Sequence, residues 1–190
     1  AKGYQAAGKL DKALPLFEET LRLQKVRLGP DHPNTLLCMG SLGWGYLEAG
    51  KLDLALPLLE ESLRLTKARL GPDHPRTHAS MSNLATGYRM VGKLDLALPL
   101  LEESLRLTKA RLGPDHPDTS ASINNLAMGY QDAGKLDLAL PLLEEAIRQT
   151  KARFGPDHPN TLRMMCNLAL VLMDNNQSDR SIPLFLEVLS

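Results

Sequence analysis

The chain has 190 residues, of which 43% are hydrophobic and 4% aromatic, and its 22 Lys and Arg balance its 22 Asp and Glu. A net charge near zero argues against nucleic acid or an anionic membrane as the main partner, since both favour proteins with clustered Lys and Arg. No apolar run approaches the roughly 20 residues that a membrane-spanning helix needs.

A sequence unit of 42 residues recurs along almost the whole chain, and the stretch from Gly50 to Pro75 appears again unchanged from Gly92 to Pro117. A fixed period of this length is typical of architectures in which each short repeat contacts only its neighbours. We expect one repeat array over residues 1–190, cut from a longer polypeptide. Its repeats are predicted at about 1–33 (truncated), 34–75, 76–117, 118–159 and 160–190 (truncated).

The first helix of each repeat is predicted from its apolar spacing. In the fourth repeat Ile123, Leu126 and Tyr130 fall at i, i+3 and i+7, which places them on one face of an amphipathic helix. We expect this helix to end just before Gly134, because glycine readily takes the left-handed conformation that follows a helix.

The second helix of the fourth repeat is expected to open with Asp137 as its N-cap. Its outer face carries Glu144 and Arg148 at the i, i+4 spacing of an ion pair, and the same pair recurs in the other repeats. Gly155 is expected to stop the helix. In the loop that follows, Asp157 is expected to cap the next helix and Pro159 to occupy its first turn.

These residues resemble the tetratricopeptide repeat, in which Asn-Leu-Ala-x-x-Tyr is followed by Gly and then by Ala, as at Asn125, Tyr130, Gly134 and Ala139. The usual repeat has about 34 residues. The longer period resembles the repeats of kinesin light chains and of related bacterial signalling proteins. The resemblance implies an all-α, right-handed α-solenoid of antiparallel helix pairs, with about four and a half repeats.

The most conspicuous candidates for chemistry are four Asp-His pairs, one in each loop between repeats. Carboxylate and imidazole can both bind metals, but a linear stack would hold these pairs about one repeat apart. We therefore interpret the pairs as helix-capping loops and expect no metal. Cys166 has no His within helical reach, and no phosphate-binding glycine loop is present. The segment is expected to be neither an enzyme nor a cofactor-binding protein. The four pairs are Asp31-His32, Asp73-His74, Asp115-His116 and Asp157-His158.

The resemblance also implies a concave groove lined by the first helices, with ligand contacts at fixed offsets from the repeat tyrosine. In the second repeat these positions are Leu37, Gly40, Ser41, Trp44, Leu47 and Glu48; in the third they are Ala79, Ser82, Asn83, Thr86, Arg89 and Met90. The candidate groove residues over all repeats are Trp44, Leu47, Asn83, Arg89, Met90, Asn124, Asn125, Met128, Gln131, Arg163 and Asn167.

Two features of these positions favour a ligand-binding surface. The positions differ from repeat to repeat although the second helices are near copies, and a purely structural array would not require that variation. They also combine apolar anchors such as Trp44, Leu47 and Met90 with a row of asparagines that can donate to and accept from a peptide backbone. A packing role for Trp44, and hydrogen bonds of the asparagines within their own repeats, are the structural alternatives.

The sequence therefore predicts a protein–protein interaction module or scaffold that holds a peptide segment of a partner in its groove. The alternative is a structural spacer or self-assembling array, either consensus-like and designed or recently duplicated. Weak end-to-end self-association is expected, because a truncated repeat leaves an apolar helix face uncovered. Cys38 and Cys166 lie about three repeats apart and read as free thiols, which favours a reducing, cytoplasmic location.

Overall fold

The computed structural model describes residues 1–6, 8–114 and 116–189, with the side chains of Lys2, Ala6 and Leu189 outside the description. Helices connected by short turns make up the described chain, which contains no strand. The residues group into two compact bodies, Ala1–Lys93 and Leu94–Ser190, which we call the N-terminal and C-terminal bodies.

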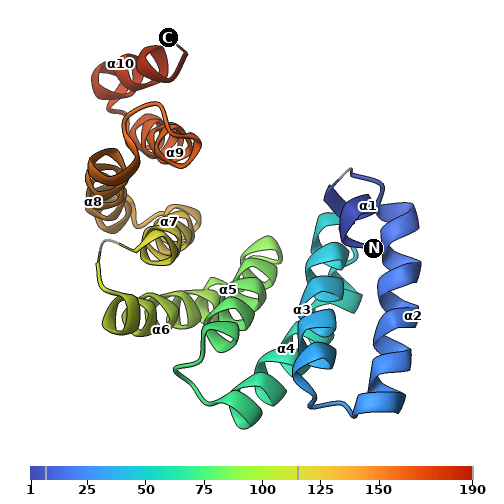
Figure 1. Ribbon diagram of the computed structural model, residues 1–190. Helices are drawn as coiled ribbons and strands as arrows, with labels where there is room; N and C mark the ends of the chain where they lie inside the picture. The colour runs from blue at the N-terminus through green and yellow to red at the C-terminus, as the bar shows by residue number, and fades with distance from the viewer. Residues whose placement is uncertain (7, 115, 190) are drawn as a thin grey trace. The chain divides into compact units, whose positions relative to one another are not determined.

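The N-terminal body contains five helices in which consecutive members pack side by side (Figure 1). These are α1 (Lys2–Ala6), α2 (Leu10–Leu28), α3 (Pro33–Glu48), α4 (Leu52–Leu70) and α5 (Pro75–Met90). Small residues let the helices approach closely: Ala55 on α4 is fully buried, and Gly43 on α3 lies against Leu59 of α4. The all-α arrangement of helix pairs is the one predicted from the repeat.

The C-terminal body repeats the pattern in α6 (Leu94–Leu112), α7 (Pro117–Asp132), α8 (Leu136–Phe154), α9 (Pro159–Asp174) and α10 (Ser178–Leu189). Its core joins Ile123 of α7, Leu143 of α8 and Met165 of α9, each at most 1% exposed. Apolar residues spaced for one face of a helix thus meet their counterparts on both neighbouring helices.

The turns inside the repeats confirm the predicted role of glycine. Gly134 takes φ +67° directly after the C-cap Ala133 of α7, and Gly50 takes φ +68° after α3. In the last repeat Asn176 occupies this place with φ 55°. Asparagine tolerates the left-handed region better than most residues, so the diverged repeat keeps the same turn.

The caps differ from the prediction. The second helix of the fourth repeat starts at Leu136 after Lys135, which makes no side-chain cap, and Asp137 lies inside the first turn. The first helices are capped by histidine rather than aspartate, since His158 Nδ1 accepts from the backbone N–H of Asn160 at 3.2 Å. Both assignments of an aspartate cap were wrong. Pro159 does occupy the first turn, as expected.

The outer charges also pair differently from the predicted i, i+4 pattern. The bonded pairs are at i, i+3, as in Glu19–Arg22 and Glu103–Arg106, both at 2.7 Å. The glutamate one position earlier is taken by the tyrosine hydroxyl of the next repeat, and Glu144 accepts from Arg180 at 2.7 Å. In the first and third repeats the contact with the next helix thus uses one glutamate, and the next glutamate pairs with the arginine. In the fourth repeat Glu145 instead bonds to Lys109 and Gln149.

Candidate functional site

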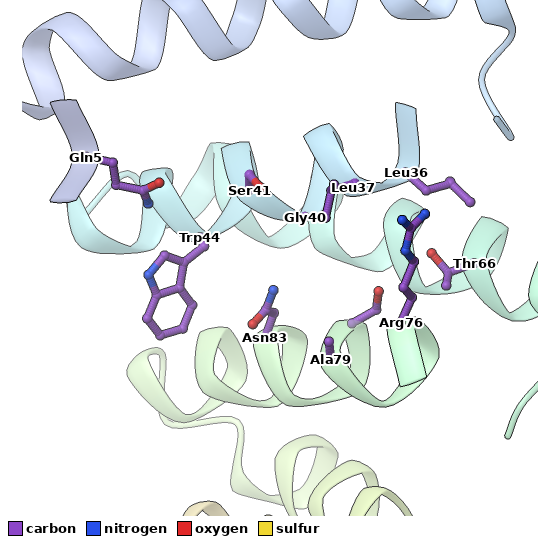
Figure 2. Close-up of a pocket in the computed structure, with 11 residues that line it drawn as sticks. Gln5, Leu36, Leu37, Gly40, Ser41, Trp44, Thr66, Arg76, Ala79 and Asn83 are labelled. Carbon is purple, nitrogen blue, oxygen red and sulfur yellow. The ribbon is translucent and has the colours of Figure 1, made fainter. Parts of the chain in front are cut away.

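A pocket of about 230 Å³ lies between the first helices of the second and third repeats, α3 and α5, within the N-terminal body (Figure 2). Trp44 lies at one end and Arg76 toward the other, with Asn83 between the two helices. The lining residues are Gln5, Leu36, Leu37, Gly40, Ser41, Trp44, Thr66, Arg76, Ala79, Ser80 and Asn83.

Trp44 keeps 37% of its surface exposed, and Leu37 in the same helix keeps 44%. Large apolar side chains exposed together beside a concave surface are typical of contact sites for other molecules. Met90 and Met128 are two further candidate groove residues. The side chain of Met90 is 50% exposed, and that of Met128 on α7 is half-buried.

Leu47 does not belong to this surface. Its side chain is only 2% exposed, and its Cδ2 lies 3.4 Å from the point where a Cβ on Gly87 would stand. Cδ2 of Leu56 on α4 lies closer to the same point, at 2.8 Å, so Leu47 packs where α4 and α5 meet. The interpretation of Leu47 as an exposed anchor is therefore corrected to a packing role between α3 and α5.

Amide side chains bond across neighbouring repeats in both bodies. In the N-terminal body Gln5 Nε2 donates to Glu48 Oε2 at 2.8 Å. In the C-terminal body Asn167 Nδ2 donates to Asn124 Oδ1 at 2.7 Å, and Gln131 Nε2 donates to Asp174 at 2.6 Å. Asn124 is only 8% exposed. These bonds connect one repeat to the next, which neither of the alternatives considered for the asparagines anticipated.

The three remaining candidate groove residues differ in how much of each side chain is exposed. Arg89 is half-buried at the end of α5, Asn125 is half-buried on α7, and Arg163 is exposed on α9. None of these three side chains lines the pocket between α3 and α5.

The histidines of the loops are engaged in capping. His32, His74 and His116 each accept at Nδ1 from a backbone N–H two residues on, at 3.1 Å, as His158 does. Among the residues that the structure describes, no group of three His, Cys, Asp or Glu side chains could hold a metal ion. Asp115, from the third Asp-His pair, lies outside the described residues.

A family model for the tetratricopeptide repeat matches the chain at residues 1–68, 46–110, 76–151 and 118–190, which together cover its whole length. The chain belongs to the tetratricopeptide repeat family. No curated protein matches it. In the part of the tetratricopeptide array that the structure describes, no helix combines the length and apolar character that crossing a membrane requires.

Solved structures show the same fold. A proposed kinesin light chain from Podosopora anserina, with nearly identical TPR-like repeats, is 29% identical over 98% of this chain and 89% of its own, with a TM-score of 0.83. BtubC (BKLC) from P. vanneervenii is 20% identical over 97% and 74%, with a TM-score of 0.80. MamA from Desulfovibrio magneticus RS-1 is 14% identical over 99% and 88%, with a TM-score of 0.63, a likeness of fold alone.

Several pocket residues of this tetratricopeptide array were not among the groove positions that the family resemblance implied. Arg76 lies in the first turn of α5 and donates from Nη1 to the carbonyl of Pro33 at 2.9 Å, while Thr66 comes from the second helix α4. The sequence does contain a signal for Arg76, because the equivalent positions are Asn34, Asp118 and Asn160. Only the third repeat places a long cation there.

Proposed function

We propose that this array is a protein–protein interaction module that binds a peptide segment of a partner in the pocket between α3 and α5. The observation that carries the proposal is the pocket itself, where an exposed tryptophan lies beside a half-buried amide on the variable face of the first helices. Concave sites with mostly apolar walls and a few convergent polar groups are the usual form of ligand sites.

The pattern of variation supports the same proposal. Helices α4 and α6 have identical sequences over 19 residues, whereas α3 and α5 differ at most of their positions. The second helices thus serve a common packing role, and the first helices carry the differences that a specific ligand would require.

The charge balance and the free cysteines complete the proposal. We expect neither nucleic acid nor a membrane as partner, since Lys and Arg do not outnumber Asp and Glu. Among the described residues Cys38 and Cys166 form no disulfide, which favours the reducing cytoplasm. No catalytic or cofactor role is proposed.

The test is a selection of peptides from a random dodecapeptide library on the intact array, followed by binding to Trp44→Ala. Removing a central aromatic anchor often costs about 2 kcal/mol or more, so affinity should fall at least roughly thirtyfold. Binding should also shift the emission of Trp44, the single tryptophan. Glu103→Ala, on the outer face of α6, is the control and should leave affinity unchanged.

If the selected peptides bind wild type and Trp44→Ala equally, the pocket is not the site. The second candidate, a spacer whose groove has no dedicated ligand, then takes its place. The specific observation that favours the spacer is the identity of α4 and α6, because near-identical repeats suffice to build a uniform rod.

A further inference from the structure

The pocket lies beside Gly40, a position at which the C-terminal body has an asparagine side chain. In the C-terminal body Asn124 fills the space between α7 and α9 and accepts from Asn167. The equivalent residues in the N-terminal body, 84 positions earlier, are Gly40 and Asn83. A Cβ added to Gly40 would meet Asn83 Nδ2 and Ser62 Oγ, both at 3.9 Å, which is ordinary contact distance. The site can therefore accept an additional group without rearrangement.

One polar group beside this space is unsatisfied. Ser62 is 1% exposed, and its hydroxyl has no hydrogen-bond partner among the described residues. The pocket itself is lined by Thr66, which is 1% exposed, by Ser80, which is 9% exposed, and by the half-buried Asn83. Buried polar groups are nearly always hydrogen-bonded, so the unpaired Ser62 hydroxyl, beside a pocket lined by Thr66, Ser80 and Asn83, points to a missing partner.

We propose that the space at Gly40 receives a carboxamide from the bound peptide, an Asn or Gln side chain that takes the place Asn124 holds in the C-terminal body. This inference rests on the proposed function and names the chemistry of its ligand. Gly40 is then a specificity-determining residue, because the same position holds Ser82, Asn124 and Cys166 in the following repeats.

The lining favours a carboxamide over a carboxylate or a hydrocarbon. Hydroxyls and the Asn83 amide can both donate and accept, as a carboxamide does. A hydrocarbon would leave them unpaired, and a carboxylate would be desolvated among neutral groups. The one cation of the lining, Arg76, already donates to Pro33 and starts seven positions before Asn83 on α5, roughly 10 Å along the helix axis at 1.5 Å per residue.

The experiment compares dodecapeptide libraries selected on wild type and on Gly40→Asn. On wild type we expect Asn or Gln to be enriched at one peptide position, and its replacement by Met or Glu in a selected peptide should weaken binding about tenfold, the scale of one or two lost hydrogen bonds. On Gly40→Asn the affinity of the same peptide should fall about tenfold and the difference between Gln and Met should disappear. Asn124→Gly, the reciprocal change in the C-terminal body, should not alter binding.

A readout without ligand checks that the substituted residue fills the space. The side-chain amide resonances of Asn83 should move in Gly40→Asn, since its Nδ2 gains the partner that Asn167 has. If Gly40→Asn does not fold, Gly40→Ser replaces it, with a smaller group at the same place.

The outcomes separate the two proposals. Selected peptides that depend on Trp44 but show no Asn or Gln preference, prefer Asp or Glu, or ignore Gly40→Asn would overturn the carboxamide inference and leave the proposed function standing. A selection that yields no Trp44-dependent peptide would overturn both.

Discussion

At the scale of single residues, a tyrosine in each of three repeats is bound to a glutamate 28 residues before it. Tyr46 donates to Glu18 at 2.8 Å, and Tyr88 donates to Glu60 at the same distance. The third pair is Tyr130 and Glu102, at 2.9 Å. Burial first, and then the hydrogen bond and negative charge of the glutamate, raise the pKa of Tyr46, Tyr88 and Tyr130 from 10.0 to about 12.

These raised pKa values predict loss of stability in alkali. The folded state favours the neutral phenol, so the stabilisation is fully present below pH 10 and is lost as the pH rises from 10 to about 12. Thermal melts between pH 9 and 12 measure the loss. Tyr88→Phe removes one phenol and should make the fall shallower. A fall of the same steepness in wild type and variant would contradict the assignment.

At the scale of helices, the spacing between α3 and its neighbours depends on individual glycines. A Cβ at Gly43 would lie 2.5 Å from Cδ2 and 2.7 Å from Cγ of Leu59, which is only 1% exposed. Leu59 cannot move aside without disturbing the core, since protein interiors are close-packed. At Gly40, three residues earlier on the same helix, the nearest atoms stand at 3.9 Å.

Two Gly→Ala changes in one helix should therefore have opposite effects. Gly43→Ala should destabilise the protein by about 1–3 kcal/mol through overpacking. Gly40→Ala should be neutral or stabilise it by up to about 1 kcal/mol, because alanine is the better helix former. Urea denaturation compares the two free energies of unfolding. Equal effects would mean that α3 and α4 do not approach as closely as the structure has them.

At the scale of the whole molecule, α10 exposes two large apolar side chains, Ile182 and Leu186. The position of Leu186 holds a glutamate in the other second helices, as at Glu102 of α6. Ile182 is 57% exposed and Leu186 is 63% exposed, whereas Leu98, which occupies the position of Ile182 in α6, is 8% exposed. Contiguous exposed apolar groups favour association with a surface that covers them.

We expect the 190-residue chain to self-associate weakly through this face. Sedimentation should give a mass that rises with concentration, and Ile182→Lys with Leu186→Lys should lower that rise. The control carries the same two charges at Leu96→Lys and Leu138→Lys, which are exposed at 44% and 43% on α6 and α8. A strict monomer at high concentration would contradict this prediction, because the apolar face of α10 would then stay exposed to solvent.

The periodicity of the sequence was enough to predict the helix pairs and the glycine turns. The resemblance to the tetratricopeptide repeat placed six of the pocket-lining residues on the groove: Leu37, Gly40, Ser41, Trp44, Ala79 and Asn83. It failed where a residue's surroundings come from another repeat. Leu47 was expected on the surface, but it is buried against α5 of the next repeat, close to Gly87. Thr66 was missed because it reaches the pocket from a second helix. Position within one repeat predicts which face a residue occupies, and the facing repeat decides whether that face is covered.

The histidine caps have a consequence for the protonation of the loops. An Nδ1 atom that accepts from a backbone N–H has no proton, so each neutral imidazole must be the Nε2–H tautomer. A metal ion seeking Nδ1 would have to displace a helix cap, and one seeking Nε2 would have to displace its proton. The sequence of these four loops resembles a set of metal ligands. In each loop, however, the histidine uses the free lone pair of Nδ1 to cap the next helix.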